Sequence, residues 1–387
     1  MISLASDSIT KEDIKNLVEW LSQEKIPKLT KGHLTVELEE KWAKKVGSKY
    51  SVFVNSGSSS ILLTLAALKE SGKLKNLKII VPALSWATDV SSPMILGYET
   101  IMCDCNLQDL SCDLNHLEQI FKKEKPSLFI LVSVLGLVPN MKQVNELCKK
   151  YDVILLEDTC ESMGSKYENK YLGSFGLASF YSMYFGHHIS TIEGGFINTN
   201  EEWLYHLLLM MRSHGWDRDL SKEKRDQLRK ENDCSEFNAL YNFYYPGFNL
   251  RSTDLQAFIG IRAIDKLDEY ANIRNRNFNM YMKLLTNNEL SLICRKEDFI
   301  SSLAMPFMHK DKNKIVELLR KSNIEIRPLI AGNMAKKPMW KNKSEGIVNC
   351  ELIDSFGFYL PNHQDLSEND VRTVCSICTQ ATLSTNS

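Results

Sequence analysis

The chain has 387 residues, of which 43% are hydrophobic and 25% charged, so its composition is that of a globular protein large enough for more than one core. A formal net charge of −1 and the lack of a long basic run argue against nucleic-acid binding. The most apolar run, residues 127–138, is shorter than the roughly 20 residues that a membrane-spanning helix needs, so we expect no membrane partner.

Helices and strands are predicted to alternate along most of the chain. Thr10 stands three residues before Asp13, as in a capping box, and apolar residues follow at helical spacing to Leu21. A second amphipathic helix covers about residues 36–46. Between residues 49 and 158, short apolar strands are separated by helical segments. This pattern predicts a parallel sheet that is covered by helices on both faces.

A long helical pattern begins at about Asp254 and leads into a part that mixes strands and helices up to Leu383. We therefore predict an α/β fold with two domains. Residues 1–250 would form a large α/β domain, and residues 251–387 would form a bridging helix and a smaller C-terminal α+β domain.

The ten cysteines show no framework spacing, and the first residues, MISLASDSITKED, lack the basic-then-apolar pattern of a signal peptide. Both observations favour the reducing cytoplasm. Cys103, Cys105 and Cys112 could supply three thiolates to a metal ion, but no fourth ligand stands at zinc-like spacing. We expect packed, reduced thiols and no metal site.

Polar and aromatic residues follow three of the predicted strands, at the sheet edge where open α/β folds bind ligands. Residues 55–60 (NSGSSS) join a strand to a helix, where free backbone amides can cradle a phosphate, although a plain helix cap is an alternative. Asp158 could hold a protonated ring nitrogen or serve as a turn residue. Trp86 could stack on a ring or fill core space.

His187 and His188 form a pair with three possible roles. As buried, hydrogen-bonded residues they need no function, and as metal ligands they would need a further ligand at suitable spacing. As a general base, either one benefits from a pKa near neutrality. The pair by itself favours the structural role, but the surrounding sequence pattern changes that balance.

The segment SFYSMYFGHHISTIEGG, residues 179–195, resembles the cofactor-lysine segment of the DegT/DnrJ/EryC1 sugar-nucleotide aminotransferases, which use pyridoxal phosphate. The resemblance extends from Gly32 and VELEEKWAKKVGSKYSVFVNSGSSS to FYLPNHQDLSENDV, and so covers essentially the whole chain. It implies the fold-type I transferase architecture, with a large α/β domain on a mixed seven-stranded sheet, a smaller C-terminal domain and a homodimer.

The resemblance also implies roles for individual residues around pyridoxal phosphate (PLP) or its amine form, pyridoxamine phosphate (PMP). The implied contacts are Gly57, Ser58 and Ser182 at the phosphate, Trp86 on the ring face, Asp158 at the ring nitrogen, and Asn249 at the phosphate across the dimer interface.

Two positions depart from the aminotransferase pattern. The family has a lysine six residues before the Glu-Gly-Gly, whereas this chain has His187 there and no lysine between Lys170 and Lys222. Glu161 stands where the aminotransferases usually have glutamine beside the ring hydroxyl. A histidine cannot form the covalent bond that lysine makes with the cofactor, but it can still move protons. Both departures resemble the sugar 3-dehydratases of this family.

The subgroup resemblance implies removal of the C3 hydroxyl from a nucleotide-linked 4-keto-6-deoxyhexose, with glutamate as the amino donor that restores PMP. Chain length favours a GDP-linked sugar, and residues 212–218 and 327–333 also resemble this subgroup. Only Cys234 lies between residues 212 and 249, so we expect no iron–sulfur centre. Candidate substrate contacts are Arg212, Arg218, Arg251, Arg327 and Asn333. Guanidinium groups bind phosphate bidentately, although these arginines could equally form structural ion pairs.

In this interpretation His187 is the base, and His188 is the reserve candidate. Two alternatives stay open at this point. One is an aminotransferase that acts on another keto sugar, and the other is a regulator that kept the fold and the cofactor site but does not catalyse.

Overall fold

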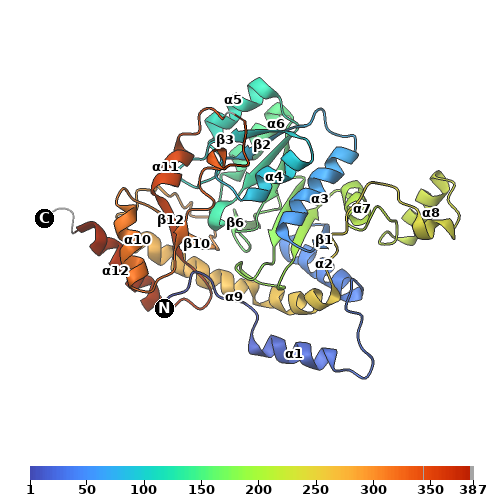
Figure 1. Ribbon diagram of the computed structural model, residues 1–387, viewed down its shortest axis with the longest axis horizontal. Helices are drawn as coiled ribbons and strands as arrows, with labels where there is room; N and C mark the ends of the chain where they lie inside the picture. Colours follow the sequence, from blue (N-terminus) through green and yellow to red (C-terminus); the bar gives the residue numbers. More distant parts are fainter. Residues whose placement is uncertain (343, 384–387) are drawn as a thin grey trace.

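The computed structural model describes residues 1–342 and 344–383, and its centre is a seven-stranded sheet (Figure 1). Its strands, in spatial order, are β1 (Tyr50–Val54), β9 (Gly195–Thr199), β8 (Ala178–Ser182), β5 (Ile154–Asp158), β4 (Leu128–Val132), β2 (Lys78–Pro82) and β3 (Glu99–Cys103). Strand β9 is antiparallel to its neighbours β1 and β8, and the other neighbouring strands are parallel. The expected mixed seven-stranded sheet is confirmed.

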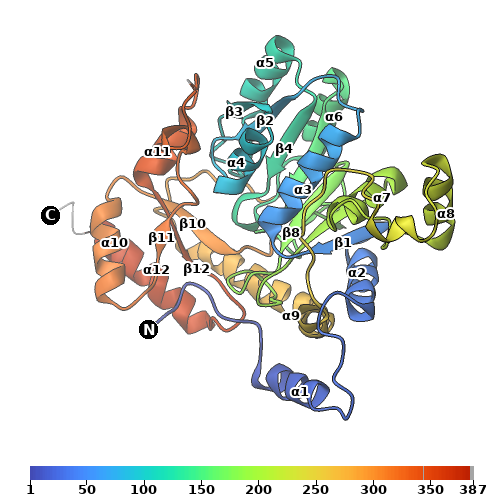
Figure 2. The same cartoon turned by 45° about the vertical axis from the view of Figure 1, so that its right-hand side comes forward.

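Helices cover both faces of this sheet, as the short, unalternating strands predicted (Figure 2). They are α2 (His33–Val46), α3 (Gly57–Glu70), α4 (Ala87–Ile95), α5 (Leu114–Glu124), α6 (Met141–Tyr151) and α7 (Glu202–Met211). Strand β1 shows how one strand serves two cores. Val52 and Val54 belong to the larger apolar cluster, whereas Phe53 points to the opposite face and packs with Trp42 and Phe196.

A smaller antiparallel sheet forms the C-terminal part. It contains β10 (Ala304–Met308), β12 (Gly357–Pro361) and β11 (Arg327–Pro328), with α10 (Lys312–Lys321), α11 (Asn349–Phe356) and α12 (Glu368–Leu383). The expected smaller α+β part is therefore present. The boundary at residue 250 stays a prediction, and the first residues reach across it, because Ile2 forms a bridge to Ile324.

The 31-residue helix α9 (Asp254–Leu284) runs along one side of the molecule and connects the two sheets (Figure 1). Thr253 and Gln256 form a capping box at its start. Near its other end, the buried Arg274 side chain donates hydrogen bonds to the carbonyl oxygens of Leu303, at 3.1 Å, and Asn362. The helix is thus fixed to the C-terminal part by a buried guanidinium group.

Two helices lie at the outside of the molecule (Figure 1). They are α1 (Lys11–Leu21), which begins with the expected Thr10–Asp13 capping box, and α8 (Lys222–Glu231), which has no buried residue. Short elements complete the described chain: β6 (Lys166–Tyr167) pairs with β7 (Lys170–Tyr171). None of the helices in the described ranges is both long and apolar enough to cross a membrane.

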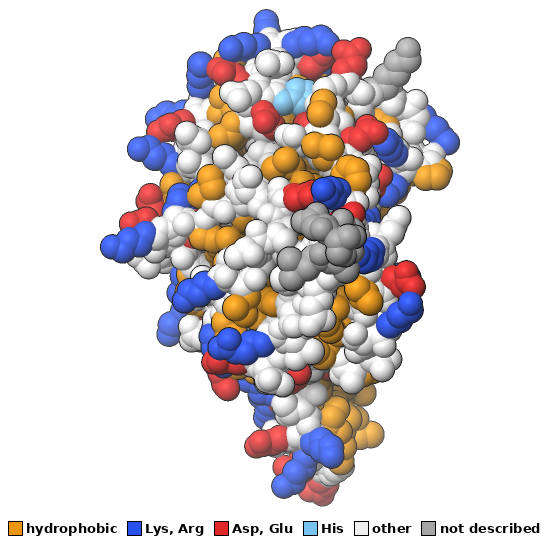
Figure 3. Space-filling view, turned by 90° about the vertical axis from the view of Figure 1, so that its left-hand side faces the viewer, with side chains coloured by type: hydrophobic (Ala, Val, Ile, Leu, Met, Phe, Trp, Pro, Cys, Tyr) orange, Lys and Arg blue, Asp and Glu red, His pale blue; other side chains and the backbone are white. Residues whose placement is uncertain are grey.

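The face that carries the C-terminal part shows basic and acidic side chains spread around its outline (Figure 3).

All ten cysteines are free thiols, and Cys103, Cys105 and Cys112 are buried, which confirms that they pack in the interior. Within the described residues, no group of three or more histidine, cysteine or acidic side chains is arranged to hold a metal ion.

Asp104, which follows β3, caps a helix of the C-terminal part. Its Oδ2 accepts the backbone N–H groups of Val348 and Asn349, each at 2.8 Å, and its Oδ1 accepts that of Cys350 at 2.9 Å. Asp104 is 4% exposed; its bond to Cys350 is buried, and its bonds to Val348 and Asn349 are partly buried. A single side chain of the large sheet thereby satisfies three amides at the start of α11.

We expect Asp104→Ala to lower the free energy of unfolding by about 2 kcal/mol, because three backbone amides at the start of α11 lose their acceptor. Asp113→Ala is the matched control, since Asp113 caps α5 through one bond to His116 N and should cost about 1 kcal/mol. Denaturant titration of both variants measures the difference. Equal losses for the two variants would contradict the special role of Asp104.

Candidate active site

The N-terminus of α3 forms a cradle beside the end of β8 and the start of β9. Ser56 caps the helix by accepting the Ser59 N–H at 3.0 Å. A Cβ atom at Gly57 would lie 2.8 Å from Ser182 Cβ, and one at Gly195 would lie 2.4 Å from the carbonyl carbon of Ser56. Only glycine permits these approaches. The structure therefore brings Gly57 against Ser182, and Ser58 follows Gly57 in the first turn, where free amides attract phosphate.

Trp86 stands at the start of α4, after the end of β2, and its side chain is 51% exposed. An exposed flat indole next to a phosphate cradle can stack on a planar ring. The loop that carries Trp86 is fixed from the C-terminal part, because Leu84 forms a bridge to Asn333 and Ser85 O accepts the Ala331 N–H.

Buried carboxyl groups collect where β5 ends. Asp158 is 5% exposed and accepts the Cys160 N–H at 2.8 Å, and Glu161 accepts the Leu135 N–H at 2.8 Å. Burial raises the pKa of Asp158 and raises that of Glu161 to about 8, the latter with help from the charge of Asp158. Such carboxyl groups favour a cationic ligand, and a protonated ring nitrogen is one.

The two histidines have different surroundings. His188 is fully buried and its Nε2–H donates to Ser301 O at 2.7 Å, which fixes the tautomer. His187 is partly exposed, and its Nδ1 has no hydrogen-bond partner. Burial, and then the positive charge of Arg274, lowers the pKa of His187 to about 4, so the imidazole is neutral at pH 7 and can accept a proton. The geometry favours His187 over His188 as the base.

Arg212 occupies the protein interior instead of a ligand surface. Its side chain is fully buried and forms an ion pair with Glu39 at 2.5 Å and another with Asp219 at 3.1 Å. It also donates to Phe53 O at 2.7 Å. The geometry therefore favours the structural ion pair that was the alternative role of Arg212, and its contact with a substrate stays a prediction.

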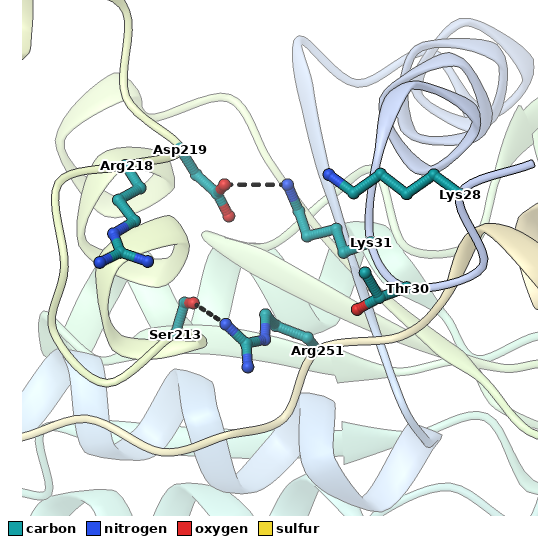
Figure 4. Close-up of a pocket in the computed structure, with 7 residues that line it drawn as sticks. All are labelled: Lys28, Thr30, Lys31, Ser213, Arg218, Asp219 and Arg251. Atoms are coloured by element: carbon teal, nitrogen blue, oxygen red, sulfur yellow. Dashed lines mark hydrogen bonds and ion pairs between the residues drawn. The ribbon is translucent and has the colours of Figure 1, made fainter.

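Arg218 and Arg251 line one cationic cavity of about 320 Å³ (Figure 4). Lys28 and Lys31 extend into it from the segment between α1 and α2, and Asp219 is its one carboxylate, paired with Lys31 at 2.9 Å. Arg251 donates to Ser213 Oγ at 3.0 Å, and its backbone forms a bridge to Val54 at the end of β1. Four cations around one carboxylate suit a ligand with several negative charges.

Sequence reasoning missed Lys28 and Lys31. The available signal was a lysine at every third position, Lys25, Lys28 and Lys31, in a segment with no periodic apolar residues. Nothing in that pattern says which sheet edge the segment approaches.

Three further predicted residues occupy distinct positions. Asn249 is exposed and its backbone forms a bridge to Ser213, and its contact across a dimer interface stays a prediction. Arg327 is exposed on β11. Asn333 is 2% exposed and its side chain accepts the Ala335 N–H in the loop beside Trp86, and its contact with a substrate stays a prediction.

Fold and site together define a class of α/β protein. At one sheet edge it carries a helix start that can bind phosphate, an exposed tryptophan that can stack on a ring, buried carboxyl groups and a neutral histidine. The model of the DegT/DnrJ/EryC1/StrS aminotransferase family matches residues 7–379. The chain belongs to this family.

Two kinds of relative make the comparison more specific. GDP-4-keto-6-deoxy-D-mannose 3-dehydratase of Escherichia coli O55:H7 is 33% identical over 348 residues, covering 87% of this chain and 89% of the relative. A crystal structure of a histidine-to-asparagine mutant of GDP-4-keto-6-deoxymannose-3-dehydratase with bound GDP-perosamine matches with a TM-score of 0.88 and 29% identity, covering 98% of this chain and 100% of that one.

A second crystal structure of GDP-4-keto-6-deoxymannose-3-dehydratase holds a trapped PLP-glutamate geminal diamine. It matches with a TM-score of 0.86 and 29% identity, covering 98% of this chain and 100% of that chain. The expected fold-type I architecture is confirmed by these likenesses.

We expect Arg212→Met to lower the free energy of unfolding by about 3–5 kcal/mol, because it leaves Glu39 and Asp219 without their buried cation. Arg218→Met is the control, since Arg218 is exposed and mainly covers the Trp216 ring, at 3.7 Å from its centroid. Its loss should cost about 1 kcal/mol. Denaturant unfolding compares them. Unchanged stability with weakened nucleotide binding in Arg212→Met would restore the substrate role.

Proposed function

We propose that this protein is a PLP/PMP-dependent 3-dehydratase that removes the C3 hydroxyl of a nucleotide-linked 4-keto-6-deoxyhexose. The observation that carries the proposal is His187, a neutral and partly exposed imidazole where the family has its cofactor lysine, in a stretch with no lysine from residue 171 to residue 221. Such a site can move a proton but cannot bind the cofactor covalently.

The residues present fit pyridoxal phosphate. The amides of Gly57 and Ser58, with the Ser182 hydroxyl, would hold the phosphate at the start of α3, where a Cβ at position 57 would intrude. Trp86 would lie against the ring face, and Asp158 would pair with the ring nitrogen. Glu161 would stand beside the ring hydroxyl. Asn249 would reach the phosphate of the partner subunit in a homodimer.

When bound, the cofactor supplies an amine for the C4 ketone of the sugar and a ring that accepts electrons released at its C4′ carbon. His187 would take the proton from that carbon. The same imidazole would then give a proton to the C3 oxygen as it leaves, which a histidine can do near neutral pH. The sugar would be released as a 4-enamine, which water would hydrolyse to a 3-deoxy-4-keto sugar and ammonia. Glutamate would then restore the amine of the cofactor.

The cationic cavity supports the proposal that a nucleoside diphosphate carries the sugar. Lys28, Arg218 and Arg251 would bind the two phosphates, because guanidinium and ammonium groups pair well with phosphate oxygens. GDP is the proposed nucleotide and 4-keto-6-deoxy-D-mannose the proposed sugar, since these belong to the relative with 33% identity. Such chemistry serves dideoxysugar synthesis for O-antigen-type lipopolysaccharide, and ten free thiols favour the cytoplasm.

The direct experiment mixes the protein with PLP, glutamate and GDP-4-keto-6-deoxymannose, and analyses the products by mass spectrometry. A sugar nucleotide without its C3 oxygen, formed together with 2-oxoglutarate, supports the dehydratase. An amine in place of the keto oxygen would show the aminotransferase instead. No conversion of any nucleotide-linked keto sugar, with PLP bound, would favour the noncatalytic regulator.

For His187→Asn we expect cofactor binding within about threefold of wild type and turnover reduced at least 100-fold, because a general base typically contributes that much. His187→Lys should also lose dehydration, and its amine should bond covalently to PLP. Borohydride reduction followed by peptide mass spectrometry detects that bond. His188→Asn is the companion variant. If it abolishes turnover while His187→Asn does not, the base is misassigned.

For the cavity we expect Lys28→Met and Arg251→Met each to raise KM for the nucleotide sugar about tenfold, which corresponds to about 1.4 kcal/mol of lost phosphate contact. Lys25→Met is the matched control, because Lys25 is exposed on the same segment and does not line the cavity. Calorimetric titration with GDP gives a second measurement without turnover. An unchanged KM and GDP affinity in both cavity variants would place the diphosphate elsewhere.

A further inference from the structure

Asp89 is a buried carboxyl group that neither the motifs nor the proposed mechanism uses. It is the third residue of α4 and is fully buried, and its Oδ2 accepts the Trp86 N–H at 3.2 Å. Its side chain also lies within hydrogen-bonding reach of the Asp158 carboxyl group. Two ionised carboxylates have no proton to share, and Asp89 Oδ1 has no donor group among the described residues.

The surroundings of this pair require one proton. The groups that act on it electrostatically are the Cys160 thiol and the Glu161 carboxyl group, and neither is a cation. Two adjacent negative charges in a dry site repel each other strongly, so such a pair holds a single shared proton. The pair therefore carries one negative charge in total.

The structure also indicates which partner keeps the proton. Burial raises the pKa of Asp158 too, but Asp158 accepts the Cys160 N–H at 2.8 Å, and this bond, with those from the Cys160 side chain and from Asp89, partly offsets the rise. Asp89 has one backbone bond, and burial and then the charge of Asp158 raise its pKa well above the ordinary value. The hydrogen bonds thus favour the charge on Asp158 and the proton on Asp89.

We propose that Asp89 is a positioning residue that stays protonated and donates a hydrogen bond to Asp158, so that the pair presents one negative charge to the one positive charge of a protonated ring nitrogen. The inference about the ring rests on the proposed function. Because Asp89 also accepts the Trp86 N–H, its carboxyl group connects Trp86, which would stack on the ring, with Asp158, which would pair with the ring nitrogen. Both cofactor contacts then keep a fixed relative position.

Thermal unfolding of the cofactor-free protein tests whether Asp89 carries the proton, independently of any cofactor. The experiment compares wild type with Asp89→Asn from pH 6 to pH 9. A carboxyl group whose pKa is raised by folding stabilises the folded state at low pH, and this stabilisation is lost as pH rises above the unfolded value. Asparagine keeps its hydrogens at every pH. The Tm of wild type should therefore fall relative to Asp89→Asn by about 2 °C per pH unit. A constant Tm difference would overturn the proposal.

Titration with PLP, followed by absorbance, tests the positioning role. Asp89→Asn should keep the dissociation constant within about threefold, because its amide also donates to Asp158, whereas Asp89→Leu should raise it at least tenfold. Equal losses in the two variants would overturn the role of the donated hydrogen bond. Circular dichroism confirms that each variant is folded.

Asp158→Asn separates this proposal from the proposed function. It should weaken PLP binding strongly, because the ring nitrogen loses its counter-charge. If Asp158→Asn binds PLP as wild type does, the cofactor assignment fails, and the cofactor-free measurements still decide whether Asp89 carries the proton.

Discussion

The close approach of α3 to the end of β8 and the start of β9 is the constraint on which the whole site depends. Gly57 and Gly195 leave no side chain between the helix and the sheet, so the first free amides of α3 lie directly against Ser182. Three residues proposed to act around the cofactor ring stand where strands end at the same edge: Trp86 after β2, Asp158 at the end of β5, and His187 after β8. This backbone contact therefore fixes the proposed phosphate site relative to Trp86, to the buried carboxyl groups and to His187.

Local signals made much of this predictable from the sequence. Short apolar strands between amphipathic helices specify a helix-covered sheet, and a strand followed by Asn-Ser-Gly-Ser specifies a helix start with free amides. His187 could be found because its significance lies in the surrounding segment. The resemblance implied a mixed sheet, but the sequence did not show that β9 is the antiparallel strand, since a buried strand has the same apolar pattern in either direction.

Long-range partners could not be read from the sequence. Arg212 pairs with Glu39, which is 173 positions away, and its burial turns a plausible phosphate ligand into an internal ion pair. Asp89 resembles an ordinary helix-start carboxylate until β5 brings Asp158 beside it. Lys28 and Lys31 gain meaning only where their segment meets Arg251. In each case the residue type was visible, and the tertiary neighbour that decides its chemistry was not.

The length of α9 has a mechanical consequence. At about 1.5 Å per residue, its 31 residues span about 46 Å, and it contacts α2 near one end and α12 and β10 toward the other. A single rigid rod thus joins the sheet that carries the cradle to the sheet that carries Arg327. The two parts cannot swing independently on a flexible linker. Any rotation of one part against the other has to bend this helix or break the hydrogen bonds of Arg274, so we expect the two parts to move as one body.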